Sequence, residues 1–518
     1  MKVQLRPELA AEIQSVIEKI VEERIASRIA AKDDSIWGPD AQSEASIRLG
    51  WVTSPYDSVE LISEIIKLRD DYAERGIDRF VLCGMGGSSL APEVITRSSK
   101  KDLFILDSTA PDQVRLALRD LQRTAVIVSS KSGSTVETDS QKRTFEQAFR
   151  DAGIDSTDRI VIVTDPGSPL DQASRQAGYT VFNADSNVGG RYSALTAFGL
   201  VPAGLTGCDI AGLLHDAASE LPNLESDSVD NPAIALAAAL AGRSQVDKFL
   251  IEADAIPSFG DWVEQLVAES TGKNDRGVLP VAVSSAAPEL TMQLKDTLSV
   301  RYAVDGADAS FAGALGELFV LWEYATAIAG WLLEINPFDQ PNVESAKIAA
   351  RKLLDEPSFT TQIDFVDRSI AVTARGFQVN GSTVEAAVES LLKQLGSDSY
   401  LSIHAYLPAS SYPQFIELRD IAAKRTQRPV TFGWGPRFLH STGQYHKGGP
   451  KQGVFLQLTQ GVPEDLSVPG REFSFGQLIS AQAKGDAEVL ESHNLPVLSL
   501  QLTNPLEALN LLEGVIRS

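Results

Sequence analysis

Cysteine, histidine and positive charge are all scarce in this sequence. Its 518 residues include two cysteines, Cys83 and Cys208, and five histidines. Two cysteines are too few for a disulfide framework or for a metal site built on thiolates. Lysine and arginine together number 46 against 69 acidic residues, so the net charge is −23. This charge argues against nucleic acids and anionic membrane surfaces as partners, and it makes any lysine or arginine beside a glycine-rich loop informative.

Long hydrophobic runs are also missing. The longest apolar region, Leu318–Ile335, is interrupted by Glu323 and Glu334, so we expect no membrane-spanning helix. The first residues, from Met1 to Pro7, lack the apolar core of a secretion signal. We therefore expect a cytoplasmic protein without a membrane partner. Hydrophobic residues make up 43% of the chain, which is enough for a large core in two domains.

The first 230 residues alternate between strand-like and helix-like patterns. Helices are predicted over Leu9–Ala31 and Ser58–Arg75. Apolar runs typical of buried strands follow, and they are Arg79–Gly84, Leu103–Asp107, Ala125–Ser129, Arg159–Thr164 and Thr180–Phe182. This alternation indicates an open parallel sheet with helices on both faces, which binds its ligands at the carboxyl ends of the strands.

The stretch after the third of these strands carries the strongest local signal. It reads Ser130-Lys-Ser-Gly-Ser-Thr135, and a helix is predicted from about Val136. Such a junction offers a phosphate free backbone N–H groups and the positive end of a helix dipole. A helix cap made of hydroxyl groups is the alternative. That alternative leaves Lys131 unexplained, because an unpaired lysine is electrostatically unfavourable at a helix N-terminus.

Two other loops are rich in glycine. Gly84-Met-Gly-Gly-Ser-Ser89 follows the first strand, and Asn187-Val-Gly-Gly-Arg-Tyr-Ser193 follows the last. The former lacks the third glycine of a dinucleotide-binding fingerprint. It indicates either close backbone approach to a small phosphorylated ligand or a tight turn. In the latter, Arg191 is either a cation facing a ligand or a surface residue beside a turn.

The second half again mixes strands and helices. Gln265 and Glu269 lie four residues apart on a predicted helix and share one face, although a solvated glutamate would give the same pattern. Residues 357–378 have a loop-like composition. The predicted helices are Asn231–Arg243, Phe259–Ser270, Phe311–Leu333 and Val343–Leu354, and the predicted strands are Lys248–Glu252, Val278–Val283, Tyr400–Tyr406, Val430–Gly433, Val454–Leu458 and Val497–Leu502.

Two of the five histidines, His440 and His446, fall in one loop between predicted strands. Together they could ligate a metal ion, but no third ligand is indicated. Acid–base use of one histidine is the favoured interpretation.

Five motifs together resemble the glucose-6-phosphate isomerase family. They occur in the family's order over about residues 80–350, and they are Gly84-Met-Gly-Gly-Ser88, Ser130-Lys-Ser-Gly-Ser-Thr135, Val188-Gly-Gly-Arg-Tyr-Ser193, Glu269-Ser-Thr-Gly-Lys273 and Asn336-Pro-Phe-Asp-Gln-Pro-Asn-Val-Glu-Ser-Ala-Lys347. The resemblance implies two flavodoxin-like sugar-isomerase (SIS) domains, each a mainly parallel sheet with helices on both faces. We expect a helical N-terminal extension over residues 1–57, a first, phosphate-binding SIS domain over 58–230 and a second over 231–518. The resemblance also implies a homodimer with no metal and no organic cofactor.

The resemblance assigns roles to single residues. Glu269 matches the base that moves a proton between C1 and C2 of the sugar, and Arg191 matches the cation that stabilises the enediolate. His440 and Lys347 match the residues to which opening of the sugar ring is assigned. Substrate and phosphate contacts match Gly87, Ser88, Ser130, Lys131, Ser132, Thr135, Gln265 and Gln340.

One motif departs from the family's order. In the family, the block that resembles Leu439-His-Ser-Thr-Gly-Gln444 lies between the glutamate motif and the Asn-Pro-Phe motif, but here it follows both. The second domain is therefore expected to be rewired, with segment 356–518 supplying some of its strands. This arrangement resembles the isomerase part of transaldolase–isomerase fusion proteins. In the family the matching histidine comes from the neighbouring subunit, so His440 could act across a dimer or within its own chain.

The predicted function is the reversible isomerisation of glucose 6-phosphate to fructose 6-phosphate, through a cis-enediolate, in glycolysis and gluconeogenesis. A non-catalytic sugar-phosphate-binding module is one alternative, although a sensor has no need for Glu269, Arg191 and Lys347 together. An isomerase that also accepts mannose 6-phosphate is the other alternative.

Overall fold

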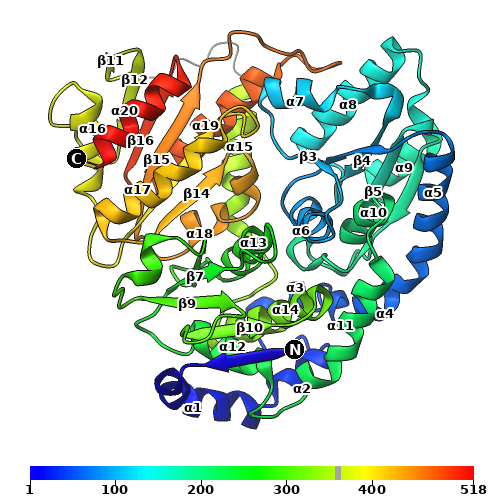
Figure 1. The fold of residues 1–518 in the computed structure, drawn as a ribbon, viewed down its shortest axis with the longest axis vertical. Helices are drawn as coiled ribbons and strands as arrows, with labels where there is room; N and C mark the ends of the chain where they lie inside the picture. Colours follow the sequence, from blue (N-terminus) through cyan, green and yellow to red (C-terminus); the bar gives the residue numbers. More distant parts are fainter. Residues whose placement is uncertain (356–362, 518) are drawn as a thin grey trace.

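The computed structural model describes residues 1–355 and 363–517, apart from the side chains of Glu344, Ala346, Lys347 and Asp355. These residues form an α/β structure with three sheets, at the upper right, in the lower part and at the upper left of Figure 1. The α/β class predicted from the sequence is confirmed. Within the described ranges, every helix is too short or too polar to span a membrane.

The first sheet contains five parallel strands in the order β3-β2-β4-β5-β6. They are β2 (Arg79–Cys83), β3 (Phe104–Leu106), β4 (Thr124–Ser129), β5 (Ile160–Thr164) and β6 (Thr180–Asn183), which confirms the predicted strands. Side chains of β4 alternate between two cores, since Ile127 packs in one hydrophobic cluster and Val126 and Val128 pack in another. Helices cover both faces, and they are α6 (Leu90–Ser98), α7 (Pro111–Ala117), α8 (Val136–Asp151), α9 (Pro169–Ala177) and α10 (Ala197–Leu205).

The strands of residues 231–518 divide between two sheets, whereas the sequence predicted one. The lower sheet has the order β1-β10-β9-β7-β8, and only β1 is antiparallel to its neighbour. Its strands are β1 (Lys2–Leu5), β7 (Lys248–Glu252), β8 (Leu279–Val283), β9 (Thr297–Tyr302) and β10 (Ala309–Ala312). The helix predicted from Phe311 is wrong at its start, because residues 309–312 form β10 and α14 (Leu315–Leu332) begins after it.

The third sheet has the order β11-β12-β16-β15-β13-β14. Its strands are β11 (Phe365–Asp367), β12 (Ile370–Arg375), β13 (Tyr400–Tyr406), β14 (Val430–Trp434), β15 (Gly453–Gln460) and β16 (Val497–Leu502). The last four are parallel and were predicted. The loop predicted over residues 357–378 is wrong for β11 and β12, which pair antiparallel with the sheet, and residues 356–362 lie outside the described ranges. The helices of this part are α15 (Pro341–Asp355), α16 (Val384–Leu392), α17 (Glu417–Thr426), α18 (Gly443–Gly448), α19 (Phe475–Ser492) and α20 (Pro505–Arg517).

The single N-terminal helix predicted over Leu9–Ala31 is instead two helices. They are separated at Arg24, whose φ of 57° lies in the left-handed region that no α-helix contains. The first helix buries one face, which is formed by its periodic apolar residues, Leu9, Ile13, Ile17 and Ile20. The helices outside the three sheets are α1 (Pro7–Glu22), α2 (Ile25–Ala30), α3 (Pro39–Ala45), α4 (Ser54–Asp57), α5 (Ile62–Glu74), α11 (Ile210–Leu224) and α12 (Pro232–Ala241).

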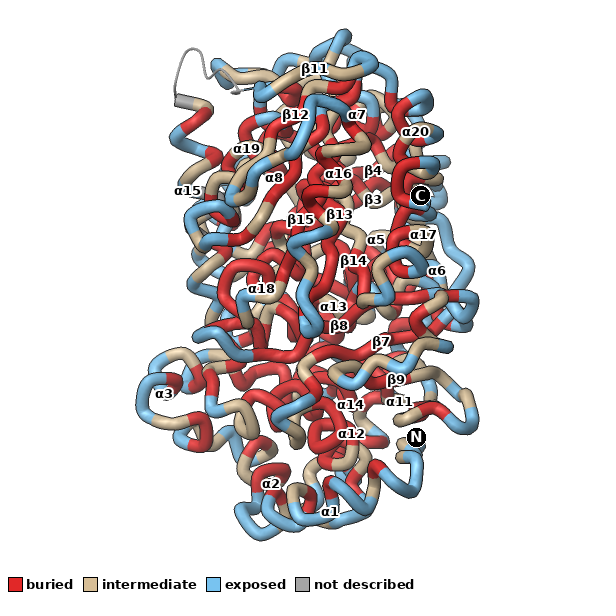
Figure 2. Tube along the Cα trace, turned by 90° about the vertical axis from the view of Figure 1, so that its left-hand side faces the viewer, coloured by how far each residue is buried: buried red, intermediate tan, exposed pale blue. Residues whose placement is uncertain are grey.

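Helix α13 (Phe259–Thr271) lies at the centre of the molecule, between the three sheets (Figure 1). The lower and third sheets share a hydrophobic cluster there, in which Leu250 and Val281 pack with Tyr400 and Phe455. Figure 2 shows that the chain around α13 and β8 is mostly buried. This central position places the side chains of α13 within reach of loops from every part of the chain.

Candidate active site

The predicted phosphate loop joins β4 to α8 with the expected boundaries, since β4 ends at Ser129 and α8 begins at Val136. Hydroxyl groups organise the turn. Ser130 Oγ accepts a hydrogen bond from the Gly133 N–H at 3.2 Å and donates to Thr135 Oγ1 at 3.3 Å. The hydroxyls of Ser132 and Ser134 are paired at 2.7 Å. The loop is therefore ordered by its own side chains before any ligand binds.

Lys131 has partners in neighbouring loops, so the expectation of an unpaired lysine is wrong. Its Nζ lies 2.7 Å from Asp165 Oδ2 and donates to the carbonyl of Ser186 at 3.1 Å. Asp165 follows β5, which neighbours β4 in the sheet, so the pair joins two adjacent loops at one sheet edge. A phosphate bound at this loop would compete with Asp165 for the ammonium group.

The glycines after β2 are required by close contacts with the protein itself. A Cβ on Gly87 would lie 2.0 Å from the carbonyl oxygen of Gly190. Gly86 has a φ of 55°, and a Cβ there would lie 2.6 Å from both Gln265 Nε2 and the His440 carbonyl oxygen. The loop therefore holds together three segments that are distant in sequence. Ser88, which follows, is partly buried.

Arg191 is 3% exposed, so the alternative of a surface arginine is wrong. Its Nη1 lies 3.2 Å from Glu269 Oε1 and donates to Gln340 Oε1 at 3.0 Å. Its Nη2 donates to the carbonyls of Pro337 and Asp339. The guanidinium thus connects the loop after β6 to α13 and to the Asn-Pro-Phe segment, and it sets one carboxylate oxygen of Glu269 in place.

Gln265 and Glu269 share a face of α13, as the sequence predicts. Gln265 Nε2 lies 3.2 Å from Glu269 Oε2 and donates to the His440 carbonyl at 2.7 Å. Glu269 therefore has a neighbour on each oxygen, Arg191 on one and Gln265 on the other. Its side chain is 13% exposed, which leaves it accessible from the site.

The backbone carbonyl of His440 binds Gln265 within its own chain, and its imidazole pairs with a different carboxylate. His440 ends the 3-10 helix η9 (Arg437–His440), and its Nε2 lies 3.0 Å from Glu137 Oε1 on α8. The structure thus places His440 beside Gln265 and Gly86 without a second subunit. Lys347 belongs to α15, and its side chain lies outside the described residues.

A cavity of about 250 Å³ connects the phosphate loop with His440. It has room for a small ligand that reaches from the α8 N-terminus toward the histidine. Its polar lining comprises Ser132, Ser134, Thr135, Glu137, His440, Arg351 and Gln482.

His446 lies elsewhere, although it is only six residues from His440. Its ring packs against Tyr400 and Phe455, and its Nδ1 is paired with the Tyr400 hydroxyl at 2.9 Å. Burial lowers the pKa of His446 well below its usual value. A metal site shared by the two histidines is therefore not formed, and in the described ranges no group of three or more acidic, cysteine or histidine residues could hold a metal ion.

Sequence reasoning assigned no role to three residues that support the site. Gln444 Nε2 donates to the Gly272 carbonyl and to Asn342 Oδ1, both at 2.8 Å, so α18 is tied to the end of α13 and the start of α15. Glu137 accepts from Gln482 and faces His440. Lys273 donates to the carbonyls of Asn336 and Asp339, and burial lowers its pKa to about 8. Gln444 and Lys273 stand inside conspicuous motifs, but their partners cannot be read from the sequence.

Known proteins with similar sequences are isomerases of sugar phosphates. The phosphoglucose isomerase family profile matches residues 58–275. A probable glucose-6-phosphate isomerase of Natronomonas pharaonis is 30% identical over 348 residues, which cover 55% of this chain and 81% of that protein. A glucose-6-phosphate isomerase of Synechococcus sp. (strain JA-2-3B'a(2-13)) is 30% identical over 379 residues, or 58% of this chain and 70% of that protein.

Two solved structures have the same fold over much of this chain. A hypothetical protein of Thermus thermophilus superposes with a TM-score of 0.58 at 23% identity, over 68% of this chain and all of that one. A glucose-6-phosphate isomerase of Chlamydia trachomatis gives a TM-score of 0.53 at 19% identity, over 68% of this chain and 86% of that one.

Proposed function

The chain belongs to the glucose-6-phosphate isomerase family, and we propose that Glu269 is its base in the interconversion of glucose 6-phosphate and fructose 6-phosphate. The observation that carries this proposal is the set of contacts that hold the carboxylate of Glu269 while leaving it accessible. Arg191 holds one oxygen of Glu269, Gln265 holds the other, and Gln265 in turn binds the segment that carries His440.

One carboxylate is sufficient for this chemistry because the two carbons concerned are neighbours. Glu269 removes the proton from C2 of the open-chain aldose, and the electrons of that C–H bond form the C1–C2 double bond of a cis-enediolate. A proton passes from O2 to O1, and Glu269 returns its own proton to C1 to give the ketose. Each step is reversible, so the same base serves both directions.

Arg191 offers the positive charge that an enediolate needs. Its guanidinium is buried, and its donors are fixed by carbonyl oxygens and Gln340. A preoriented charge in a site with little water stabilises the developing oxyanion without reorganisation at the moment of reaction. We assign Arg191 to this role and Gln340 to its orientation.

The phosphate loop and His440 lie along one cavity, which suits a substrate with a phosphate at one end. We assign Gly87, Ser88, Ser130, Lys131, Ser132 and Thr135 to the phosphate end, where binding energy positions the distant C1–C2 unit. We assign His440, held by Glu137, to proton transfer at the sugar-ring oxygen, with Lys347 as its partner in ring opening.

We further propose a cytoplasmic homodimer, as in the resemblance on which the sequence prediction rests. Whether such a dimer would share its active sites depends on which chain supplies His440 to each site. Because the backbone carbonyl of His440 binds Gln265 in its own chain, we propose that each chain supplies its own His440.

A coupled assay that follows glucose 6-phosphate formed from fructose 6-phosphate tests the activity, with and without EDTA. We expect turnover that EDTA leaves unchanged. Mannose 6-phosphate in the same assay determines whether the C2 epimer is also accepted. A protein that binds fructose 6-phosphate without turnover would favour the non-catalytic alternative.

In the same assay, Glu269→Gln should lower kcat about a thousandfold while the substrate Kd stays close to that of the wild type, because the amide keeps the shape but cannot accept the proton. Glu264→Gln is a matched control, since it makes the same change on the same helix at a residue that lines a different cavity. Near-normal turnover of Glu269→Gln would contradict its assignment as the base.

A further inference from the structure

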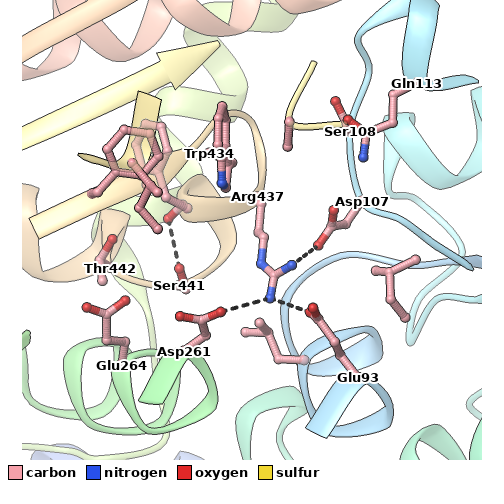
Figure 3. A pocket seen from close by; sticks show the side chains of 18 of the residues that line it. Glu93, Asp107, Ser108, Gln113, Asp261, Glu264, Trp434, Arg437, Ser441 and Thr442 are labelled. Carbon is pink, nitrogen blue, oxygen red and sulfur yellow. Dashed lines mark hydrogen bonds and ion pairs between the residues drawn. The ribbon is translucent and has the colours of Figure 1, made fainter. Parts of the chain in front are cut away.

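A second cavity, of about 520 Å³, is lined by Arg437 and Phe438 of η9, whereas His440 lines the cavity described above. Arg437, the first residue of η9, projects into the second cavity and is surrounded by carboxylates (Figure 3). Its guanidinium lies 2.6 Å from Glu93, 3.1 Å from Asp107 and 3.5 Å from Asp261. Arg437 is 17% exposed, and Glu93 and Asp107 are almost fully buried.

Two of the three carboxylates belong to elements that build the active site, and the third follows a strand of the first sheet. Glu93 lies on α6, which follows the turn containing Gly86 and Gly87. Asp107 follows β3. Asp261 lies on α13, one turn before Gln265. One side chain therefore connects η9 to α6, which follows the Gly86 turn, and to α13, whose Gln265 binds the His440 carbonyl.

The position of η9 depends on these ion pairs more than the position of α13 does. It is four residues long, whereas α13 has thirteen residues and packs in the hydrophobic core. A 3-10 turn of this length has little stability of its own. Removal of the guanidinium would take the cation away from the buried carboxylate of Asp107, whereas Glu93 would keep its pair with Arg97 at 2.8 Å. The short segment is the part that can move in response.

We propose that Arg437 is a positioning residue, whose ion pairs to Glu93, Asp107 and Asp261 hold η9 so that His440 reaches the sugar ring. The inference rests on the proposed function, because it needs His440 to act in ring opening. It predicts a selective defect: loss of Arg437 impairs opening of the cyclic substrate and leaves proton transfer by Glu269 largely intact.

The test compares a cyclic substrate with one that cannot close its usual ring. Fructose 6-phosphate is mostly a furanose closed through its 5-hydroxyl, whereas 5-deoxyfructose 6-phosphate lacks that hydroxyl and stays open. Turnover of the first is followed by the coupled assay. For the second, NMR follows exchange of the C1 protons with deuterium in D2O, which reports enediolate formation directly.

Arg437→Met should lower kcat on fructose 6-phosphate at least tenfold and change exchange on the open-chain ketose less than threefold. Arg437→Lys, which keeps the charge but not the fork of donors, should fall between Arg437→Met and the wild type. Arg419→Met is the matched control. Arg419 is also buried and pairs with Glu289 at 2.6 Å, joining α17 to the lower-sheet part of the chain. Its loss should lower the melting temperature without changing either rate below that temperature.

Equal losses on both substrates, or no loss on either, would overturn the proposal. If Arg437→Met fails to fold, Asp107→Asn removes one of the three charges and should give a smaller defect confined to fructose 6-phosphate. Failure of the proposed function gives a different result, because the wild type would then promote neither turnover nor exchange.

Discussion

The structural roles of single residues in this molecule depend mainly on contacts with residues that are distant in sequence. Gly86 and Gly87 resemble ligand-binding glycines in sequence, yet the structure gives each a contact with protein backbone. Arg191 is buried by contacts with residues about 80 and 150 positions later. Its charge and the glycines beside it could be read from the sequence, but its carbonyl partners could not.

Lys131 is the one cation of the phosphate loop, and its present partners are Asp165 and the Ser186 carbonyl. Lys131→Ala should weaken binding of fructose 6-phosphate and of inorganic phosphate by roughly 1.5–3 kcal/mol, the range of a charge-assisted hydrogen bond. Calorimetric titration measures both affinities. Lys142→Ala is the control, since it removes the same charge from α8 at a lysine paired with Glu146 and away from the loop. Equal losses in the two variants would mean that net charge, and not the loop, determines binding.

The residues that sequence reasoning missed have a common physical cause. Gln444 binds Asn342, Glu137 faces His440, and Arg437 binds Glu93, at separations of 102, 303 and 344 residues. A side chain at such a distance leaves no periodic pattern around either partner. The motif residues were found because glycine, hydroxyl and charged residues cluster locally in their loops.

At the scale of elements, α13 separates two environments. Gln265 and Glu269 face the active site, and Asp261 and Glu264 line the cavity around Arg437. Burial, with a smaller contribution from Asp261, raises the pKa of Glu264 to about 8. One oxygen of Glu264 accepts the Ala282 N–H at 2.8 Å, and this hydrogen bond holds the group in place.

This pKa predicts how the stability of the protein depends on pH. In the unfolded chain a glutamate titrates near 4.3, so the folded protein keeps a proton that the unfolded chain loses between about pH 4.5 and 8. The stability contributed by this group is fully present below that window and is lost as the pH rises through it. Glu264→Gln removes the titration and keeps the acceptor for Ala282.

We therefore expect Glu264→Gln to melt close to the wild type at pH 5 and at a higher temperature at pH 9, by an amount equivalent to a few kcal/mol. Differential scanning calorimetry at several pH values measures the change. Glu64→Gln, at an exposed glutamate of α5, should give a constant difference across this range. A difference for Glu264→Gln that does not grow with pH would contradict its protonation in the folded state.

The elements that sequence reasoning located correctly are the ones with strong apolar runs. β2, β4 and β5 are buried along almost their whole length and read as continuous hydrophobic segments. β9 was missed because only alternate residues of Thr297–Tyr302 are buried near its start, and β10 was merged with the apolar helix after it. The break between α1 and α2 depends on one left-handed arginine, which has no sequence signature.

At the scale of the whole molecule, segments that are distant in sequence complete the same sheet or the same site. β1 at the N-terminus pairs with β10, about 300 residues later. The segment after α15 forms a separate sheet and returns η9 and α18 to the active site. The displaced Leu439–Gln444 motif predicted that this segment was rewired, but the number of sheets depends on strand pairing that local sequence does not encode.

We propose that one chain assembles the whole site, with Glu269 and His440 in cis. The most direct test of this central claim mixes two inactive variants, Glu269→Gln and His440→Ala, which are unfolded together and refolded, with refolded wild type as the reference. A site shared between subunits would restore one working site in each heterodimer, or about a quarter of the wild-type activity for random pairing. A site within one chain predicts no recovery above the two variants refolded separately, and recovery near a quarter would contradict the claim.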